Sequence, residues 1–351
     1  TGHDDDRQTS SPAAPDRKQH LPMTSNATSG PMTAEQAAWF AQTFSTLVDN
    51  VGQAVLGKTH VVRLTLTAML AEGHILLEDA PGTGKTMLAK ALAATVDGTH
   101  HRIQFTPDLL PSDVTGVTIY DQKTSVFEFH KGPIFASVVL ADEINRASPK
   151  TQSALLEVME ESRVTVDGTS YPVGRPFMVI ATQNPIEQAG TYRLPEAQLD
   201  RFLMKTSLGY PDHASTVQIL AGSAARDRTS AITSVISSAA VASMADLAAT
   251  VYVDTSINDY VARLAEATRT DAETRLGVSV RGCLALVRCA KVWAAAQGRA
   301  YVIPDDVKEL AVAVLSHRLV LDVEAEFAGV TPEEIVERIL GETVPPTERA
   351  V

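Results

Sequence analysis

Cysteine, aromatic residues and long hydrophobic runs are all scarce in this sequence, and each shortage excludes a class of protein. Two of the 351 residues are cysteines, too few for a small secreted scaffold held together by disulfides. No run approaches the roughly 18 consecutive apolar residues of a membrane-spanning helix, and no basic segment followed by an apolar one suggests a secretory signal. We therefore expect a cytoplasmic protein with no membrane span.

The two cysteines, Cys283 and Cys289, are six residues apart. On one helix this separation places them about 240° apart, too far for a disulfide or a shared metal ion. We expect two small core residues in a reducing compartment. The histidines are scattered, so we predict no structural metal site.

Positive charge is also in short supply. The 30 lysines and arginines stand against 42 aspartates and glutamates, for a net charge of −12, so no nucleic-acid partner is expected. Half of this net charge lies in the last 30 residues, which hold eight acidic and two basic side chains. This segment is either a solvated acidic face or a docking surface for a basic partner.

Composition divides the chain into four segments. Residues 1–33 are rich in Ser, Thr, Pro, Ala and Asp without apolar periodicity, which predicts a disordered tail. Over 34–225 short strand-like runs alternate with helical ones, the pattern of an α/β fold with a parallel sheet flanked by helices. Beyond about residue 225 the strand signals stop, which predicts a small all-helical domain over 226–341 and a tail over 342–351.

Three apolar runs predict buried strands, at 74–77, 137–141 and 177–181. Ligands of open α/β sheets bind beyond the carboxyl ends of the strands, so the polar residues after these runs are the first candidates for a site. Two further segments alternate around turns and predict hairpins, at 118–129 and at 163–173.

A glycine-rich loop follows the first of these strands and precedes a helical run. In this context the glycines let backbone N–H groups converge on phosphates, Lys85 reaches the β and γ phosphates, and Thr86 offers a hydroxyl to Mg²⁺. Asp79 stands where the usual pattern has its first glycine, and its effect on nucleotide affinity stays open. The candidate nucleotide-binding residues of this loop and helix are Pro81, Gly82, Thr83, Gly84, Lys85, Thr86 and Met87.

Polar residues after the other two strands complete a site for hydrolysis of ATP. Asp142 would join Thr86 around Mg²⁺, and Glu143 would polarise the attacking water. The amide of Asn184 would orient that water. Phosphoryl transfer also needs cations against the charge of the transferred group, and a neighbouring subunit can supply them. The candidates are Arg201 and Arg281, and for Arg281 action within one chain or between chains stays open.

Several motifs resemble those of the MoxR family of AAA+ ATPases, over about residues 35 to 340. They are Asp142–Ala147 with its continuation Pro149–Glu157, Ala181–Pro185, and Leu194–Phe202. Departures are few: Arg193 and Val280 stand where many relatives have proline.

The resemblance implies a role for each matching residue. Lys85 and Thr86 would be the Walker A pair, Asp142 and Glu143 the Walker B pair, Asn184 sensor 1, Arg201 the arginine finger, and Arg281 sensor 2. Leu56 and Gly57 would lie against the adenine. The hairpins at 118–129 and 163–173 would be the helix-2 insert and the pre-sensor-1 hairpin, facing the pore of a ring, and 226–341 would be the lid.

The resulting hypothesis is a Mg²⁺-dependent ATPase that forms a homo-oligomeric ring, a hexamer, and remodels or activates client proteins. The family resemblance implies a partner with a von Willebrand factor A domain. Two alternatives remain: a nucleotide-gated assembly scaffold with slow turnover, and a DNA-directed AAA+ motor, against which the net charge argues.

Overall fold

The computed structural model describes residues 30–184, 191–221 and 232–347. Residues from Pro31 onward form one compact unit. The predicted N-terminal tail lies outside the described residues up to residue 29, as do the boundary predicted at 225/226 and residues 348–351. The three predicted boundaries between segments therefore stay predictions.

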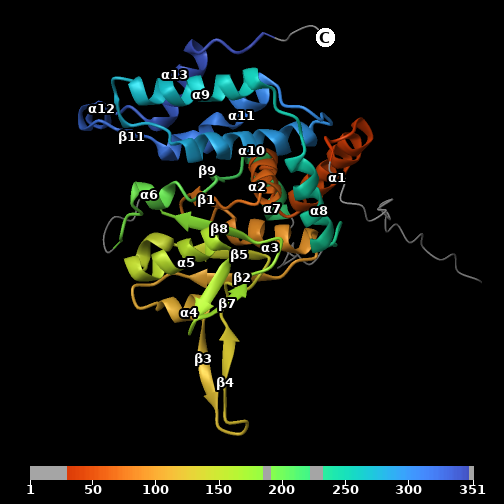
Figure 1. Ribbon diagram of the computed structural model, residues 1–351, viewed down its shortest axis with the longest axis vertical. Coiled ribbons are helices and arrows are strands. Elements are labelled where there is room, and N and C mark those ends of the chain that lie inside the picture. The colour runs from red at the N-terminus through yellow and green to blue at the C-terminus, as the bar shows by residue number, and fades with distance from the viewer. Residues whose placement is uncertain (1–29, 185–190, 222–231, 348–351) are drawn as a thin grey trace, which may run out of the picture. The chain divides into compact units, whose positions relative to one another are not determined.

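A five-stranded parallel sheet forms the centre of the fold (Figure 1). The three apolar runs of the sequence are its neighbouring strands β5, β8 and β1, which confirms the predicted α/β sheet. Two strands with polar sequences, β2 and β9, extend it at either side. In spatial order the strands are β2 (His100–Gln104), β5 (Val138–Asp142), β8 (Met178–Gln183), β1 (Ile75–Glu78) and β9 (Met204–Thr206).

The two faces of the sheet bury alternate residues of each strand, as strand geometry requires. Ile75 and Leu77 of β1 pack into one apolar cluster, whereas Leu76 between them packs into another. The first cluster continues into the C-terminal helices. It also includes residues of α1 (Ala34–Gly52), α2 (Thr59–Leu70), α3 (Lys85–Thr95) and α8 (Ser238–Ala249). The second cluster includes residues of α4 (Pro111–Thr115), η1 (Ile144–Arg146) and α5 (Pro149–Glu161).

Helices begin where the sequence supplies caps. Thr33 and Gln36 form a capping box at α1, and Thr331 and Glu334 form another at the last helix, as the sequence of that helix predicts. Two short helices, α6 (Glu196–Leu199) and α7 (His213–Ala221), flank β9.

The C-terminal part is mainly helical, as predicted. Its helices are α9 (Thr255–Thr270), α10 (Val280–Ala296), α11 (Pro304–Leu315), η3 (Ser316–Arg318), α12 (Val323–Phe327) and α13 (Pro332–Glu342). The expectation that strands end near residue 225 is wrong in one detail: β10 (Thr274–Leu276) and β11 (Val320–Leu321) form a small antiparallel sheet. Strands this short leave no alternation to detect in the sequence.

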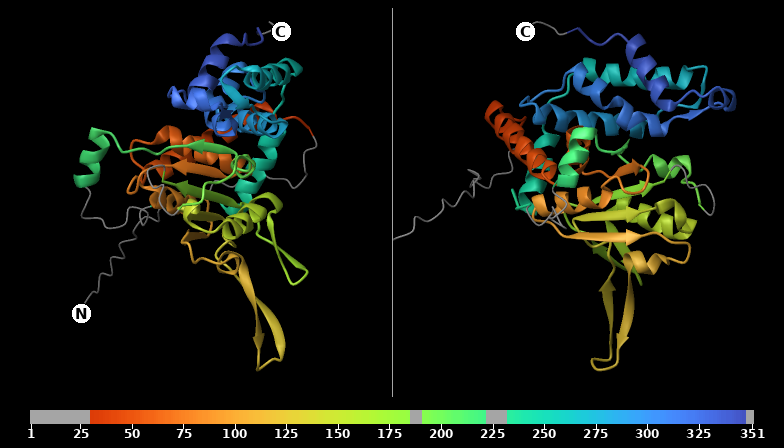
Figure 2. Two further views of the ribbon diagram at one scale, coloured as in Figure 1. Left: turned by 90° about the vertical axis from the view of Figure 1, so that its left-hand side faces the viewer. Right: turned by 180° about the vertical axis from the view of Figure 1, so that it is seen from behind.

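Both predicted hairpins form. The first, β3 (Gly116–Asp121) with β4 (Val126–Lys131), projects from the sheet (Figure 2). The second is β6 (Arg163–Val166) with β7 (Thr169–Pro172), and its turn places Asp167 and Gly168 at positive φ. The hairpins touch where the ring of Phe129 stacks on that of Tyr171, with centroids 4.3 Å apart.

Both cysteines are free thiols on α10. Cys289 is buried and Cys283 is half-buried. The predicted core position is therefore confirmed for Cys289, whereas Cys283 is only partly in the core. Within the described ranges there is no cluster of three or more potential metal-binding side chains. No helix among these residues is both long and apolar enough to cross a membrane.

Candidate active site

The glycine-rich loop connects the carboxyl end of β1 to α3. Gly82 and Gly84 adopt φ of 83° and 99°, a region that favours glycine because it has no Cβ. Space is open around Gly82, where an added Cβ would meet no atom within 4 Å. Helix α3 begins directly at Lys85, so its N-terminal N–H groups and its dipole meet the loop. This arrangement fits the phosphates of a nucleotide.

Lys85 extends over its own loop. Its Nζ donates hydrogen bonds to the carbonyl oxygens of Asp79 and Ala80, each at 3.1 Å. Phosphate oxygens are stronger acceptors for an ammonium group than neutral carbonyls are. The ammonium is therefore placed to exchange these carbonyls for the phosphates of a bound nucleotide.

Asp79 points away from the phosphate side of the loop. Its buried carboxylate accepts hydrogen bonds from the Ser207 hydroxyl at 2.8 Å and from the backbone N–H groups of Leu208 and Gly209, each at 2.7 Å. The departure from glycine thus fastens the start of the loop to the segment after β9. It leaves the glycine-lined side of the loop open.

The segment after β9 also links the loop to the residues expected beside the adenine. Leu208 lies 3.8 Å from a Cβ position on Gly84, and Lys58 donates to the carbonyl of Tyr210 at 2.7 Å. Leu56 and Gly57 precede Lys58, and Gly57 lies against Ser215 at positive φ. The loop that carries Leu56 and Gly57 therefore lies against the chain that follows β9, which also anchors the phosphate loop.

Asp142 ends β5, and its carboxylate is almost buried. One oxygen accepts from the Thr182 hydroxyl at 2.6 Å, and the other from the Arg102 guanidinium at 2.6 Å. The Thr86 hydroxyl and this carboxylate are both hard oxygen donors, the kind of ligand that Mg²⁺ prefers. The donor set thus fits the predicted metal.

Glu143 follows in the left-handed backbone region, with φ 58° and ψ 50°. Its Oε2 accepts hydrogen bonds from the Gln104 amide at 2.7 Å and from Arg146 at 3.1 Å. Asn184 follows β8 and is also almost buried. Because β8 lies between β5 and β1, Asn184 stands between the acidic pair and the phosphate loop.

The two candidate cations lie elsewhere. Arg201 and Arg281 both pair with Glu160, at 3.1 and 3.2 Å. Glu160 is in the last turn of α5, which follows β5 and returns to the amino edge of the sheet. The residues that directly precede β1 and β9, His74 and Leu203, line the same cavity as the two arginines.

Arg201 and Arg281 are therefore brought together, but not beside the phosphate loop of their own chain. The four residues of β1 separate the two edges of the sheet by roughly 13 Å at about 3.3 Å per residue. Within one chain the two arginines thus lie at the opposite edge, and their part in a complete site stays a prediction. The cause is the topology, because Arg201 lies shortly before β9 of the parallel sheet.

Family models match both parts of the chain. The model described as "ATPase family associated with various cellular activities (AAA)" matches residues 74–204, and that of the AAA lid domain matches residues 266–339. YeaC of Bacillus subtilis is 47% identical over 86% of this chain and 95% of its own length. Chaperone MoxR1 of Mycobacterium tuberculosis is 39% identical over 92% of this chain and 87% of its own length.

The chain belongs to the MoxR family of AAA+ ATPases. Protein MoxR of Methylorubrum extorquens is 30% identical over 84% of this chain and 92% of its own length. A crystal structure of a Cytophaga hutchinsonii protein, for which ATPase activity has been suggested, superposes with a TM-score of 0.83 at 40% identity. The superposition covers 90% of this chain and 98% of the Cytophaga hutchinsonii chain. The protein is thus an ATPase with an AAA+ core and a helical lid.

Two cations of this MoxR-family chain escaped the sequence reasoning. Arg102 binds Asp142 from β2, a strand whose polar sequence, His-His-Arg-Ile-Gln, gives no strand signal. Arg318, in the lid, is 3% exposed and pairs with Asp200 at 2.7 Å. Burial lowers the pKa of the Arg318 guanidinium, and the charge of Asp200 opposes this shift. The sequence signal for Arg318 is a charged residue among apolar ones near the end of a helix, because a charge buried there needs a partner.

Arg318 lines the same cavity as Arg201 and Arg281. The cavity has a volume of about 250 Å³. Its lining joins the end of α5, the start of β1 and the first turns of α10. The lid of this AAA+ ATPase thus contacts the amino edge of the sheet at a point rich in arginine.

Proposed function

We propose that this chain is a Mg²⁺-dependent ATPase that assembles into a hexameric ring and remodels or activates client proteins. The observation that carries the proposal is the separation of the site between two edges of the sheet. The phosphate loop, the acidic pair and Asn184 occupy the carboxyl edge, whereas Arg201 and Arg281 occupy the amino edge. A complete site requires a second copy whose amino edge faces the nucleotide, and a closed ring satisfies this for every copy.

The residues have these proposed roles. Backbone N–H groups from Gly82 to Thr86 and the Lys85 ammonium hold the phosphates, while Leu56 and Gly57 flank the base. Thr86 and Asp142 hold Mg²⁺, which would neutralise charge on the phosphates when bound. Glu143 accepts a proton from the attacking water, and Asn184 orients that water. Arg201 and Arg281 of the neighbouring copy offset the charge of the transferred phosphoryl group.

Client remodelling is proposed because a relative at 39% identity is named Chaperone MoxR1. The hairpin β3–β4 supports it, since its exposed apolar side chains offer an attachment surface for a polypeptide; they are Val117, Ile119, Tyr120, Val126 and Phe127. We further propose a partner with a von Willebrand factor A domain, for which the acidic C-terminal segment is the docking surface. The reducing, cytoplasmic compartment stays a prediction.

Glu143→Gln tests the enzymatic proposal. The variant should bind ATP as the unaltered protein does, and should hydrolyse it about 10²–10⁴-fold more slowly, because it lacks the general base. Glu157→Gln, at an exposed position of α5, is the matched control and should keep full turnover. Unchanged hydrolysis in Glu143→Gln would remove Glu143 from the mechanism.

Sizing with and without ATP distinguishes the alternatives. A ring that forms with ATP but shows negligible turnover, even with its partner, would favour the assembly scaffold. Stimulation of turnover by DNA with a steep salt dependence would favour the DNA-directed motor.

A further inference from the structure

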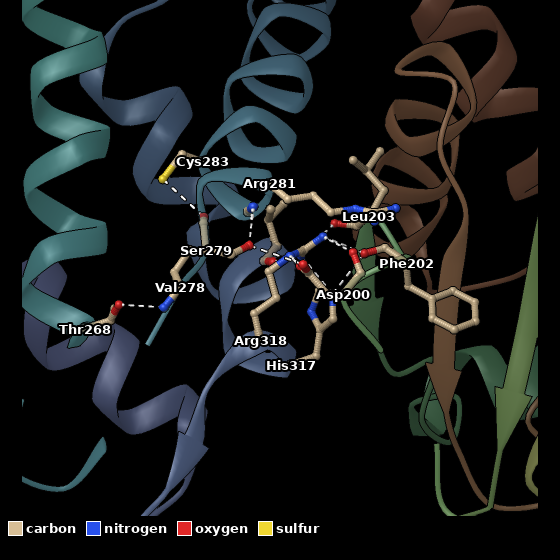
Figure 3. Close-up of polar contacts among 12 residues, drawn as sticks. Asp200, Phe202, Leu203, Thr268, Val278, Ser279, Arg281, Cys283, His317 and Arg318 are labelled. Atoms are coloured by element: carbon tan, nitrogen blue, oxygen red, sulfur yellow. Dashed lines mark hydrogen bonds and ion pairs between the residues drawn. The ribbon is translucent and has the colours of Figure 1, made fainter. Parts of the chain in front are cut away.

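Arg318 joins the lid to the segment that carries Arg201. Its side chain is 3% exposed, and its guanidinium N–H groups donate to several acceptors across the boundary between lid and core (Figure 3). Nε donates to the Asp200 carboxylate at 2.7 Å, and one terminal nitrogen donates to the Phe202 carbonyl at 2.7 Å. The other terminal nitrogen lies 3.4 Å from the Leu203 carbonyl. One lid side chain therefore holds the backbone on both sides of Arg201.

Asp200 receives a second bond from the lid. Its other oxygen accepts from the Ser279 hydroxyl at 3.2 Å, and Ser279 is the N-cap of α10, the helix that carries Arg281. Asp200 directly precedes Arg201, and Ser279 stands two residues before Arg281. The Asp200 carboxylate thus connects the backbone just before Arg201 to the start of the helix that carries Arg281.

The packing leaves room for this junction at one position of α10. A Cβ added to Gly282 would lie 2.9 Å from Cδ of Arg318 and 2.7 Å from a methyl group of Val278. Both distances are below normal van der Waals contact, so a side chain at this position would displace Arg318. The missing side chain of Gly282 is therefore what allows the arginine to pass beside α10.

The lid contains a second arginine–carboxylate pair, whose two partners both lie within the lid. Arg299 forms two hydrogen bonds to Asp306, at 2.7 and 2.5 Å, at the start of α11. This pair resembles that of Arg318 in chemistry and lies in the same lid. It therefore separates a general effect on lid stability from an effect on the two cations.

We propose that Arg318 is a positioning residue that holds Arg201 and Arg281 in one fixed arrangement. Through Asp200 it fixes the backbone of Arg201, and the same carboxylate holds the N-cap of the helix that bears Arg281. The lid and the arginine finger then present their cations to the neighbouring nucleotide as a unit. This inference rests on the action between subunits proposed above.

The test uses two full-length variants that are each inactive alone. The receiver, Arg201→Ala, keeps its own nucleotide site but offers no finger to its neighbour. The donor, Glu143→Gln, offers the finger but cannot hydrolyse ATP. Mixed before assembly with ATP, they should recover turnover at interfaces where a donor faces a receiver. No recovery would overturn the proposed action between subunits.

Arg318→Lys is then added to one member of the pair at a time. In the donor it should lower the recovered kcat by about 10–100-fold, because misplacing a catalytic group by roughly 1 Å has an effect of this size. The KM for ATP should change less than twofold, since the receiver binds the nucleotide. In the receiver the same substitution should leave the recovery intact. Arg299→Lys in the donor is the matched control and should also leave it intact.

Two results would overturn the positioning role while the proposed function stands. One is full recovery with the Arg318→Lys donor, and the other is an equal loss with the substitution in either member, which indicates a structural effect only. If Arg318→Lys does not fold, Asp200→Asn and Gly282→Ala replace it in the same arms. Asp200→Asn removes the charge that Arg318 contacts, and Gly282→Ala displaces Arg318. The same donor-specific loss is expected from each, and its absence from both would reject the inference.

Discussion

The amide of Gln104 donates a hydrogen bond of 2.7 Å to Oε2 of Glu143, the oxygen that also accepts from Arg146. Gln104 ends β2, and two strands separate β2 from β1, the strand that the phosphate loop follows. A carboxylate held in this way has one oxygen engaged before any water arrives. Strand β2 therefore restrains the group that we propose as the general base.

Gln104→Ala should raise the basal rate of ATP hydrolysis. A hydrogen bond to a charged group contributes about 1.5 kcal/mol or more, and if this bond must break before Glu143 meets the water, its loss accelerates turnover by up to roughly tenfold. Steady-state phosphate release measures the effect. Gln297→Ala, at an exposed position after α10, should behave as the unaltered protein. A slower Gln104→Ala enzyme would show that Gln104 aligns Glu143 for catalysis.

The sequence was sufficient for the carboxyl edge of the sheet. Lys85, Asp142 and Asn184 each follow a strongly apolar strand, and parallel strands bring their carboxyl ends to one edge whatever the details of packing. Local patterns therefore predict both the strands and the neighbourhood of these three side chains. The short lid strands and the polar strand β2 carry no such pattern, and they form because tertiary packing decides them.

The arrangement of the arginines could not be predicted in the same way. Arg318 meets Asp200 across 118 residues of chain, and no local periodicity encodes so distant a pair. Arg201 lies at the amino edge because it shortly precedes β9, and Arg281 lies near it because Ser279, at the start of its helix, bonds to Asp200. Spacing alone identifies these arginines as candidates, but only the fold shows at which edge they lie.

Asp79 should stabilise the protein, although it departs from the usual loop pattern. Asp79→Ala leaves the N–H groups of Leu208 and Gly209 and the Ser207 hydroxyl without their acceptor. Groups buried in this way cost about 1–3 kcal/mol each when unsatisfied, so we expect a loss of roughly 3 kcal/mol in the free energy of unfolding. Urea denaturation measures it. Asp79→Asn, which retains one acceptor oxygen, should lose less, and equal stability of all three proteins would contradict the anchoring role.

His74 should make the fold less stable in mild acid. Its ring is buried, accepts from the Val179 N–H and lies 3.0 Å from the Met159 carbonyl. Burial lowers its pKa from 6.5 to about 4. The folded state therefore keeps His74 neutral while the unfolded chain takes up a proton below pH 6.5, so stability present above pH 6.5 is lost as the pH falls towards 4.

Between pH 7 and pH 5 this difference amounts to about 2 kcal/mol, at about 1.4 kcal/mol per pH unit below 6.5. His317, whose pKa burial also lowers, acts in the same direction. Urea unfolding at pH 7, 6 and 5 measures the dependence. His74→Asn should flatten it, whereas His213→Asn, at an exposed position, should not. An unchanged slope in His74→Asn would exclude His74 as its source.

Glu160 should hold back catalysis by occupying both arginines of the amino edge. Its carboxylate pairs with Arg201 and Arg281, so a neighbouring phosphate must compete with it for the two cations. The three side chains are 30–44% exposed, and pairs of this kind contribute only about 0–1 kcal/mol each. Glu160→Gln should therefore raise kcat modestly, by about two- to fivefold, measured at saturating ATP and at several protein concentrations. Glu157→Gln, about one turn earlier on the same helix, should leave kcat unchanged. A fall in kcat with Glu160→Gln would instead mean that the carboxylate aligns the arginines, because losing a competitor can only free them.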